Sequence, residues 1–214
     1  MLEVKDIPFL LRNCIFEDLC ESNYYKNVIS NIDDNKIAWE TGATKLILFP
    51  QDSNFVIKIP FCGEMYDDFN GLYAPFVHAK EPNKWDYCKA ESLIYRSAIL
   101  ENLDTFFAET KYIGSVNNHP IYIQEKVSIF FESKNSKYYS KEESKKIRNL
   151  CSRLDLYCFH PYWLSDFLKF YTKESLIKLQ NFLRFNYIQD LHGGNLGYRA
   201  NGMPVIIDYG DYYE

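Results

Sequence analysis

The sequence has few of the features that assign a protein to a class at first sight. Its six cysteines are scattered without a CxxC pair, so neither a disulfide framework nor a zinc site is indicated. No basic tail or patch accompanies the net charge of -5, which argues against nucleic acid as a partner. No apolar run approaches the ~20 residues of a membrane span, so we expect no membrane association and a cytoplasmic location.

The chain does have ample material for a packed core. Hydrophobic residues make up 47% and aromatic residues 17% of its 214 residues, enough for one large domain or two small lobes. Near residue 127 the pattern changes from short β-rich runs to helical periodicity. Residues 1–38 contain no motif, and we assign them only a helical or capping role.

The first half predicts strands around one main helix. A hairpin with Lys58 inside an apolar strand is predicted by TKLILFP and FVIKIPF, which the polar link QDSN joins. A helix is indicated by WDYCKAESLIYRSAILENL, whose apolar residues recur at helical spacing. A second hairpin is predicted by TFFAETKYIG and HPIYIQEKV on either side of the turn SVNN, which gives the order β, β, α, β, β.

The second half predicts helices, then a loop and a hairpin. Ser140 and Glu143 have the spacing of a helix capping box. Helical periodicity follows in DFLKFYTKESLIKLQNFLRF, with a break between two helices expected at Thr172 and Glu174 to Ser175. A loop and a hairpin that ends at Asp208 are indicated by YIQDLHGGNLGYRANGMPVIIDYG, because it contains Gly-Gly and Asn-Gly turns between short apolar runs.

Five polar residues stand in apolar or glycine-rich surroundings: Lys58, Glu91, Asp190, Asn195 and Asp208. Each alone is more often structural, solvated or part of a turn. Together they match what phosphoryl transfer from a nucleoside triphosphate needs: a cation on the phosphates, an anion that positions it, two oxygen ligands for Mg²⁺, and a carboxylate near the acceptor hydroxyl.

The wording and spacing of two motifs resemble the protein-kinase-like superfamily. In DLHGGN, Asp190 precedes Asn195 by five positions, and IDYG places Asp208 thirteen positions further on, with Tyr209 where the family has Phe. The DLHxGN form is similar to that of the compact aminoglycoside- and choline-kinase-like branches and of short bacterial or phage kinase-like proteins. The resemblance runs from about Thr41 to Gly210.

The resemblance implies a nucleotide site in the first half of the chain. FVIKIPF is similar to the strand with the phosphate-contacting lysine, which implies Lys58. Its partner carboxylate is best matched by Glu91, with Glu101 as a second candidate. IYIQEKV resembles the hinge that grips adenine, with Gln124 guarding the pocket and Glu125 to Val127 as the hinge.

In the second half, the resemblance implies roles for the loop residues. Asp190 would orient or deprotonate the acceptor hydroxyl, and Asn195 and Asp208 would chelate Mg²⁺ on the phosphates of ATP. Lys58 would neutralise phosphate charge. His192 has two interpretations: it contacts acceptor or phosphate, or it forms a hydrogen bond that stabilises the loop.

Glycines that cover the phosphates are scarce here. ETGATK offers only Gly42, although it resembles the reduced G-[AS]-[ST]-[KR] turn of short kinase-like proteins, in which the Thr44 hydroxyl and backbone amides would replace missing glycine contacts. An ordinary β-turn explains the same residues equally well. Gln189 and Ile188 also depart from the family pattern before the catalytic loop.

The implied fold is α+β: a two-lobed kinase-like fold with nucleotide in the cleft between the lobes. Residues 1–127 would form the N-terminal lobe with an antiparallel sheet, including an extension at 1–38. Residues 128–214 would form a truncated, mainly helical C-terminal lobe. Only DYYE follows Gly210, so we expect the acceptor to be bound by the insertions 62–85 and 128–165, or no acceptor in the usual sense.

Three hypotheses remain open at this stage. The first is an active minimal phosphotransferase that uses ATP and Mg²⁺ and acts on a protein or small-molecule acceptor. The second is a pseudokinase that binds nucleotide or serves as a scaffold, favoured by the single glycine and by Gln189. The third is an unrelated α/β protein with chance matches.

Overall fold

The computed structural model describes twelve stretches of the chain: residues 3–12, 15–16, 29–30, 37–41, 45–60, 63–64, 77–78, 86–116, 119–129, 140–153, 161–189 and 191–210. The chain forms two compact units, one of Met1–Ser92 with Thr110–Lys126 and one of Leu93–Glu109 with Val127–Glu214. The sequence predicts residues 93–109 in the first lobe, whereas in the structure they cluster with the second unit.

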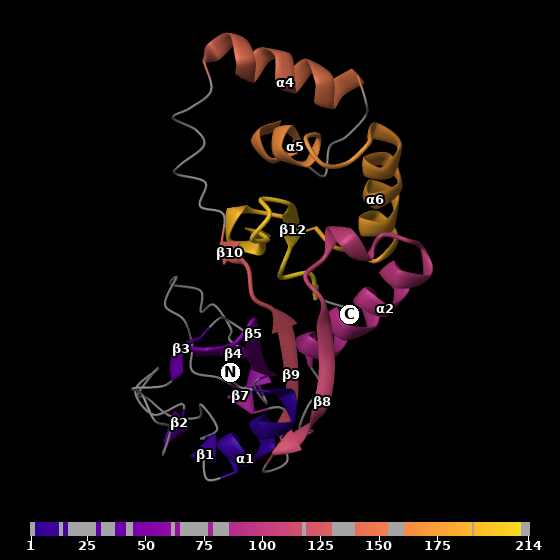
Figure 1. Cartoon of the computed structure of the whole chain (residues 1–214). Helices are drawn as coiled ribbons and strands as arrows, with labels where there is room; N and C mark the ends of the chain where they lie inside the picture. Colours follow the sequence, from indigo (N-terminus) through magenta and orange to yellow (C-terminus); the bar gives the residue numbers. More distant parts are fainter. Residues whose placement is uncertain are drawn as a thin grey trace. The chain divides into compact units, whose positions relative to one another are not determined.

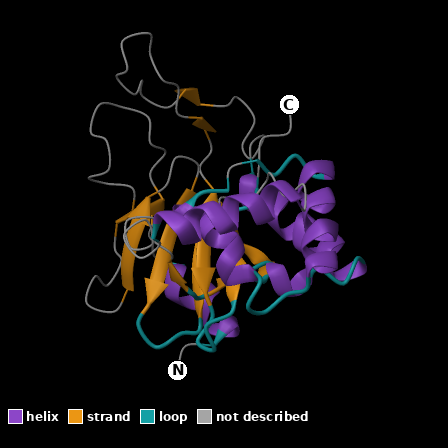
Figure 2. Cartoon of the chain, turned by 90° about the horizontal axis from the view of Figure 1, so that it is seen from above, coloured by secondary structure: helices purple, strands orange, loops and turns teal. Residues whose placement is uncertain are grey.

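The first unit is built on a five-stranded antiparallel sheet in the order β3-β4-β5-β9-β8 (Figures 1 and 2). Its strands are β3 (Ile37–Thr41), β4 (Lys45–Pro50), β5 (Phe55–Pro60), β8 (Thr110–Val116) and β9 (His119–Glu125). Both predicted hairpins are therefore confirmed, while β3 was not predicted. The short pairs β1 (Ile15–Phe16) with β2 (Ile29–Ser30), and β6 (Gly63–Glu64) with β7 (Val77–His78), are also antiparallel.

One face of the sheet is apolar. Leu46 pairs with Ile59 and Leu48 with Ile57, and directly opposed residues of an antiparallel ladder share a face. The cluster on this face also includes Ile7 and Leu11 of the short helix α1 (Ile7–Leu11), both fully buried. Each such side chain contributes about 1.5–3 kcal/mol when it is removed from water, so this face supplies the core of the first unit.

The other face has a row of polar side chains. Lys58 of β5 is opposite Ile47 of β4 and Tyr122 of β9. Gln124, two residues further along β9, is opposite Thr110 of β8. Because residues two apart in a strand share a face, these polar side chains run across three neighbouring strands. All six residues of β5 are buried, so both faces of this central strand are covered.

Helix α2 (Tyr87–Leu100) begins in the first unit. Asp86 precedes it and accepts a hydrogen bond at 2.8 Å from the backbone N–H of Lys89, as an N-cap carboxylate does. The other Asp86 oxygen accepts a hydrogen bond from the Tyr122 hydroxyl at 2.6 Å. The first turn of α2 is therefore tied to the polar face of the sheet.

The second unit is mainly helical and contains a small sheet in the order β10-β11-β12. Besides the second half of α2, its elements are η2 (Asp104–Phe106), β10 (Ser128–Ile129), α4 (Lys141–Arg153), α5 (Pro161–Phe167), α6 (Lys173–Phe185), η3 (Gly193–Asn195), β11 (Leu196–Tyr198) and β12 (Pro204–Ile206). The observed fold is thus a mixed α+β fold. None of the described helices is long and apolar enough to cross a membrane.

The predicted helix starts are confirmed. The Ser140 backbone N–H donates to Glu143 Oε2 at 2.8 Å, and the Glu143 N–H donates to Ser140 Oγ at 3.1 Å, which completes a capping box for α4. Thr172 is the N-cap of α6, and its side chain accepts a hydrogen bond from the Ser175 N–H. The predicted break is confirmed at Thr172, whereas Glu174 and Ser175, also predicted as part of it, lie in the first turn of α6.

Two helices end in the same way, with a non-glycine residue in the left-handed region. After α6, Tyr187 has φ of 55°, its N–H bonds to Arg184, and the Ile188 N–H bonds to the Leu183 carbonyl at 2.9 Å. This pattern is a Schellman motif, and it buries Ile188 in the core of the second unit. After α2, Asn102 adopts φ of 54° in an equivalent motif.

The segment between α2 and β8 is attached to β12. The Ala108 N–H donates to the Ile206 carbonyl at 2.8 Å, and the buried Tyr209 hydroxyl donates to the Ala108 carbonyl at 2.7 Å. The Tyr209 ring packs edge-on against Phe107, with ring centroids 4.9 Å apart. These contacts explain why residues 93–109 belong to the second unit.

Candidate functional site

The predicted lysine and glutamate of the first unit form an ion pair. Lys58 Nζ donates to Glu91 Oε1 at 3.0 Å and to Oε2 at 2.8 Å. Lys58 is 3% exposed and Glu91 is fully buried. Glu101, the alternative partner, is exposed and follows α2 in the second unit. Of the two candidate glutamates, the structure brings Glu91 to Lys58.

A second lysine, which the sequence analysis did not select, joins this pair. Lys45, the first residue of β4, donates from Nζ to Glu91 Oε1 at 2.8 Å and is 3% exposed. Lys45 is opposite Pro60, two residues along β5 from Lys58. The two lysines are therefore diagonal neighbours on the polar face, and Glu91 of α2 lies within hydrogen-bonding distance of both.

Gln124, the predicted guard of the nucleotide pocket, is buried beside this cluster. Its Nε2 donates to Thr110 Oγ1 at 2.8 Å and to Glu91 Oε2 at 3.3 Å. A carboxylate that accepts several hydrogen bonds is held in one orientation, so Gln124 helps to fix Glu91. The predicted hinge residues belong to different units: Glu125 ends β9 in the first unit, and Val127 belongs to the second.

Burial shifts the pKa values of three other groups near this cluster: Asp86, Tyr122 and Cys88. Burial raises the pKa of Asp86, although the hydrogen bond from Tyr122 opposes that shift. Burial, followed by the bond to Asp86, raises the pKa of Tyr122. Burial also raises the pKa of the Cys88 thiol, which makes it a structural rather than a reactive cysteine.

In the second unit, the two predicted Mg²⁺ ligands flank the hairpin of β11 and β12: Asn195 directly precedes β11, and Asp208 follows β12. Leu196 pairs with Ile206, and the Ile207 N–H donates to the Asn195 carbonyl at 2.9 Å, which extends the ladder by one step. Asn195 is therefore opposite Ile207, and Asp208 follows Ile207 at the same end of the hairpin. Asn195 is 8% exposed and Asp208 is half-buried.

His192 has a clear structural role. Its Nδ1 accepts a hydrogen bond from the Gly194 N–H at 2.9 Å, so its side chain caps the 3-10 turn that carries Asn195. A Cβ atom on Gly194 would lie 2.7 Å from His192 Cε1, closer than van der Waals contact allows. Of its two interpretations, the loop-stabilising hydrogen bond is the one seen in the structure.

Three predicted site residues lie outside the part of the chain that the structure describes: Gly42, Thr44 and Asp190. Among the described residues, no group of three or more His, Cys, Asp or Glu side chains is placed to hold a metal ion. The side chains of Asn195 and Asp208 nevertheless offer oxygen donors of the kind that suits Mg²⁺, which is usually held by one or two protein oxygens together with water and substrate phosphates.

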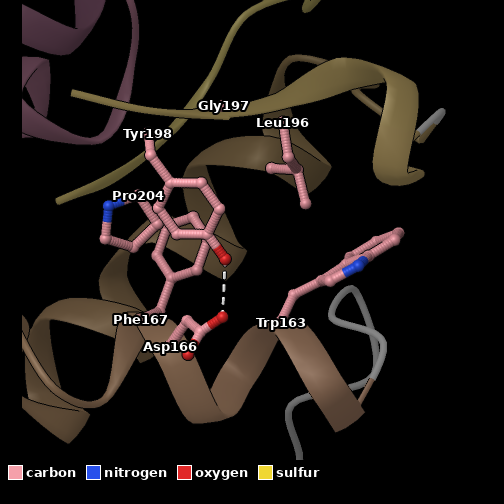
Figure 3. A pocket seen from close by; sticks show the side chains of 7 residues that line it. All are labelled: Trp163, Asp166, Phe167, Leu196, Gly197, Tyr198 and Pro204. Atoms are coloured by element: carbon pink, nitrogen blue, oxygen red, sulfur yellow. Dashed lines mark hydrogen bonds between the residues drawn. The ribbon is translucent and has the colours of Figure 1, made fainter. Parts of the chain in front are cut away.

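A small hollow in the second unit is a separate feature (Figure 3). The Tyr198 hydroxyl donates to Asp166 Oδ2 at 2.6 Å, and Lys169 donates to Asp166 Oδ1. The Tyr198 and Asp166 side chains that line the hollow are thus hydrogen-bonded to each other. None of the predicted site residues lines it. The hollow is lined by Trp163, Asp166, Phe167, Leu196, Gly197, Tyr198 and Pro204.

Comparison with known proteins identifies no relative: no family model, no curated protein and no solved structure matches the chain. The chemistry of the site is therefore inferred from the residues themselves. The first unit offers buried ammonium groups on a shared carboxylate, which suit an anion. The second unit offers a carboxylate and an amide, which suit a hard cation.

Proposed function

We propose that this protein is a kinase-like, ATP-dependent phosphotransferase with a two-lobed kinase-like fold. It would bind Mg-ATP and transfer the γ-phosphate to a protein or small-molecule acceptor. The observation that carries the proposal is the buried pair of Lys58 and Glu91. A strand lysine held by both oxygens of a helix glutamate is the arrangement that a phosphate-contacting lysine of this class requires.

The hairpin of the second unit supports the same function. The motifs DLHGGN and IDYG lie on either side of this hairpin, with Asn195 and Asp208 at the same end of it. Mg²⁺ bound there would neutralise charge on the phosphates of the nucleotide. Asp190, by its position in the sequence motif, would accept the proton of the acceptor hydroxyl. A cytoplasmic location, expected because no apolar run in the sequence approaches the length of a membrane span, remains a prediction.

A pseudokinase is the second candidate. The stretch Thr41 to Lys45 contains a single glycine, so fewer backbone N–H groups can approach phosphates closely than in active kinases with glycine-rich loops. Such a protein would bind nucleotide, or only display a surface, without turnover. The two candidates differ in whether ADP is formed.

Calorimetric titration of ATP with and without Mg²⁺ tests the proposal. We expect binding that needs Mg²⁺, that is lost in Lys58→Ala and Asp208→Ala, and that is unchanged in Asp52→Ala, an exposed control. Absence of ATP binding to the unmodified protein would contradict the nucleotide site. Unchanged Mg²⁺-dependent binding in Asp208→Ala would contradict the metal-ligand assignment.

ADP release then separates the two candidates. An active enzyme should lose roughly 10²–10⁴-fold in turnover in Asp190→Asn while it still binds ATP, because a general base acts only in the chemical step. Binding without any ADP formation above the rate of Asp190→Asn, with every acceptor class tested, would favour the pseudokinase.

A further inference from the structure

We propose that Lys45 and Lys58 together form a two-cation site for the phosphate chain of the nucleotide, so that the first unit recognises a polyphosphate rather than a single phosphate. This inference rests on the proposed function and deepens it. The juxtaposition of the two lysines on Glu91 carries it. Only one of the two lysines was predicted from the family resemblance.

The sheet register places the side chains of Lys45 and Lys58 on the same face of the sheet. Lys45 is opposite Pro60, and Lys58 is opposite Ile47, so the two lysines are diagonal neighbours on adjacent strands. Both donate to Glu91 Oε1, at 2.8 and 3.0 Å. Two positive charges are thus held within reach of one carboxylate oxygen.

Stability alone does not explain this arrangement. Burying an ammonium group has a large desolvation cost, and buried ion pairs are often no more stabilising than apolar residues of similar volume. The opposite face of the same strands is filled by residues such as Leu46 and Ile57, so an apolar filling suits this sheet. Here two ammonium groups converge on the Glu91 carboxylate, and two neighbouring cations on one face favour an anionic ligand.

The ligand that fits two such cations is a chain of phosphates. Lysine acts on phosphate as a point charge on a flexible stem, so each ammonium group would contact a different phosphoryl group. The hydrogen bonds to Glu91 would restrict how far each ammonium group moves. The scarcity of glycine before Lys45 fits this inference, because a side-chain cation would supply attraction that backbone N–H groups do not.

The test uses the full chain and compares ATP, inorganic tripolyphosphate, orthophosphate and adenosine as ligands in calorimetric titration. Lys45→Met leaves Lys58 and Glu91 as a balanced pair, and Lys45→Gln keeps a donor toward Glu91, so at least one neutral variant is expected to fold. Lys45→Arg keeps the charge. Lys111→Gln removes one positive charge at an exposed position of β8 and is the matched control.

We expect the neutral Lys45 variants to lose about tenfold to a hundredfold in affinity for ATP and tripolyphosphate, as for loss of one charged hydrogen bond. Lys45→Arg and Lys111→Gln should stay within about threefold of the unmodified protein, because the charge near the phosphates is kept. Orthophosphate should bind far more weakly than tripolyphosphate. Adenosine affinity should be the same in all variants.

The outcomes separate this inference from the proposed function. If ATP binding depends on Lys58 but is unchanged in both neutral Lys45 variants, the two-cation site is wrong and the nucleotide site stands. If the unmodified protein binds neither ATP nor tripolyphosphate, both are wrong. If Lys111→Gln lost as much affinity for ATP as the neutral Lys45 variants, the effect would come from the overall charge of the protein. That result would also overturn the two-cation site.

Discussion

Lys58 and Glu91, which are 33 residues apart in the chain, meet in a buried ion pair in which the ammonium contacts both carboxylate oxygens. Lys45 contacts the same carboxylate from the neighbouring strand. The Glu91 carboxylate therefore accepts hydrogen bonds from both buried lysines. Its removal and the removal of either lysine have different electrostatic consequences.

Glu91→Gln should strongly destabilise the protein, by roughly 3–5 kcal/mol, because it leaves two buried ammonium groups without their shared carboxylate. Lys45→Met should cost less, since a one-to-one pair remains. Glu101→Gln, at an exposed glutamate just after α2, is the control and should stay within about 0.5 kcal/mol. Free energies of unfolding from urea titration measure all three. A Glu91→Gln variant as stable as Glu101→Gln would show that the cluster is hydrated rather than dry.

Gly194→Ala should destabilise the turn before Asn195 by about 1 kcal/mol or more, since the new methyl group meets the His192 ring and forces it off its cap. The backbone of Gly194 is not in the left-handed region, so the penalty comes from contact alone. His192→Ala should cost about 1 kcal/mol through loss of the cap.

A double-mutant cycle tests this contact. In the His192→Ala background the ring is absent, so adding Gly194→Ala should cost much less than it does alone, with a coupling of about 0.5–1 kcal/mol. Additive losses of stability would mean that the His192 ring does not lie over Gly194. Asn195, the proposed Mg²⁺ ligand, lies in the same turn, so we expect Mg²⁺ affinity to fall in the Gly194→Ala variant.

Local sequence signals predicted much of the fold. The capping box at Ser140 and the break at Thr172 depend on contacts within four residues, and such contacts are written directly in the sequence. The hairpin of β4 and β5 was also predicted, and its four-residue link is enough to set the register that places Lys45 near Lys58. The sequence therefore contains the signal that places Lys45 near Lys58, namely the position of Lys45 in the predicted hairpin.

Features that depend on distant contacts could not be predicted. The strand β3 is defined by its pairing with β4, and its sequence IAWET alternates too briefly to stand out. Residues 104–109 continue the chain toward β8, yet they join the second unit because Tyr209 and Ile206 bind Ala108. The choice of Glu91 over Glu101 likewise came from a resemblance and needed the structure to supply the contact.

The carboxyl group of Asp86 should make a pH-dependent contribution to stability of unusual sign. Burial raises its pKa above the ordinary 3.8, so the folded state binds a proton more readily than the unfolded state. Its contribution to stability is then fully present below pH 3.8 and is lost as pH rises through the raised pKa. Most carboxylates in ion pairs contribute in the opposite sense.

The difference in unfolding free energy between the unmodified protein and Asp86→Asn isolates this contribution. Asparagine keeps a helix-capping oxygen and cannot ionise in this range. We expect the unmodified protein to lose stability relative to Asp86→Asn as pH rises from 3.8 through the acidic range, and the difference then to level off. A difference that grows in favour of the unmodified protein over that range would mean that the Tyr122 hydrogen bond outweighs burial.

Tyr187→Gly should stabilise the protein, although it removes an aromatic side chain. Tyr187 adopts a φ of 55° in the Schellman motif after α6, and a left-handed conformation costs a residue with a Cβ about 1–2 kcal/mol. Its side chain is 61% exposed, so little packing is lost. Glycine lacks the Cβ penalty but has more freedom in the unfolded chain, so we expect a net gain of about 0.5–1 kcal/mol.

Asn102→Gly is the matched variant, because Asn102 has nearly the same φ of 54° after α2. Asparagine tolerates the left-handed region better than tyrosine, so its replacement should gain less than Tyr187→Gly does. Urea titration of both variants measures the order. A loss of stability in Tyr187→Gly would mean that the tyrosine ring makes contacts worth more than the backbone strain.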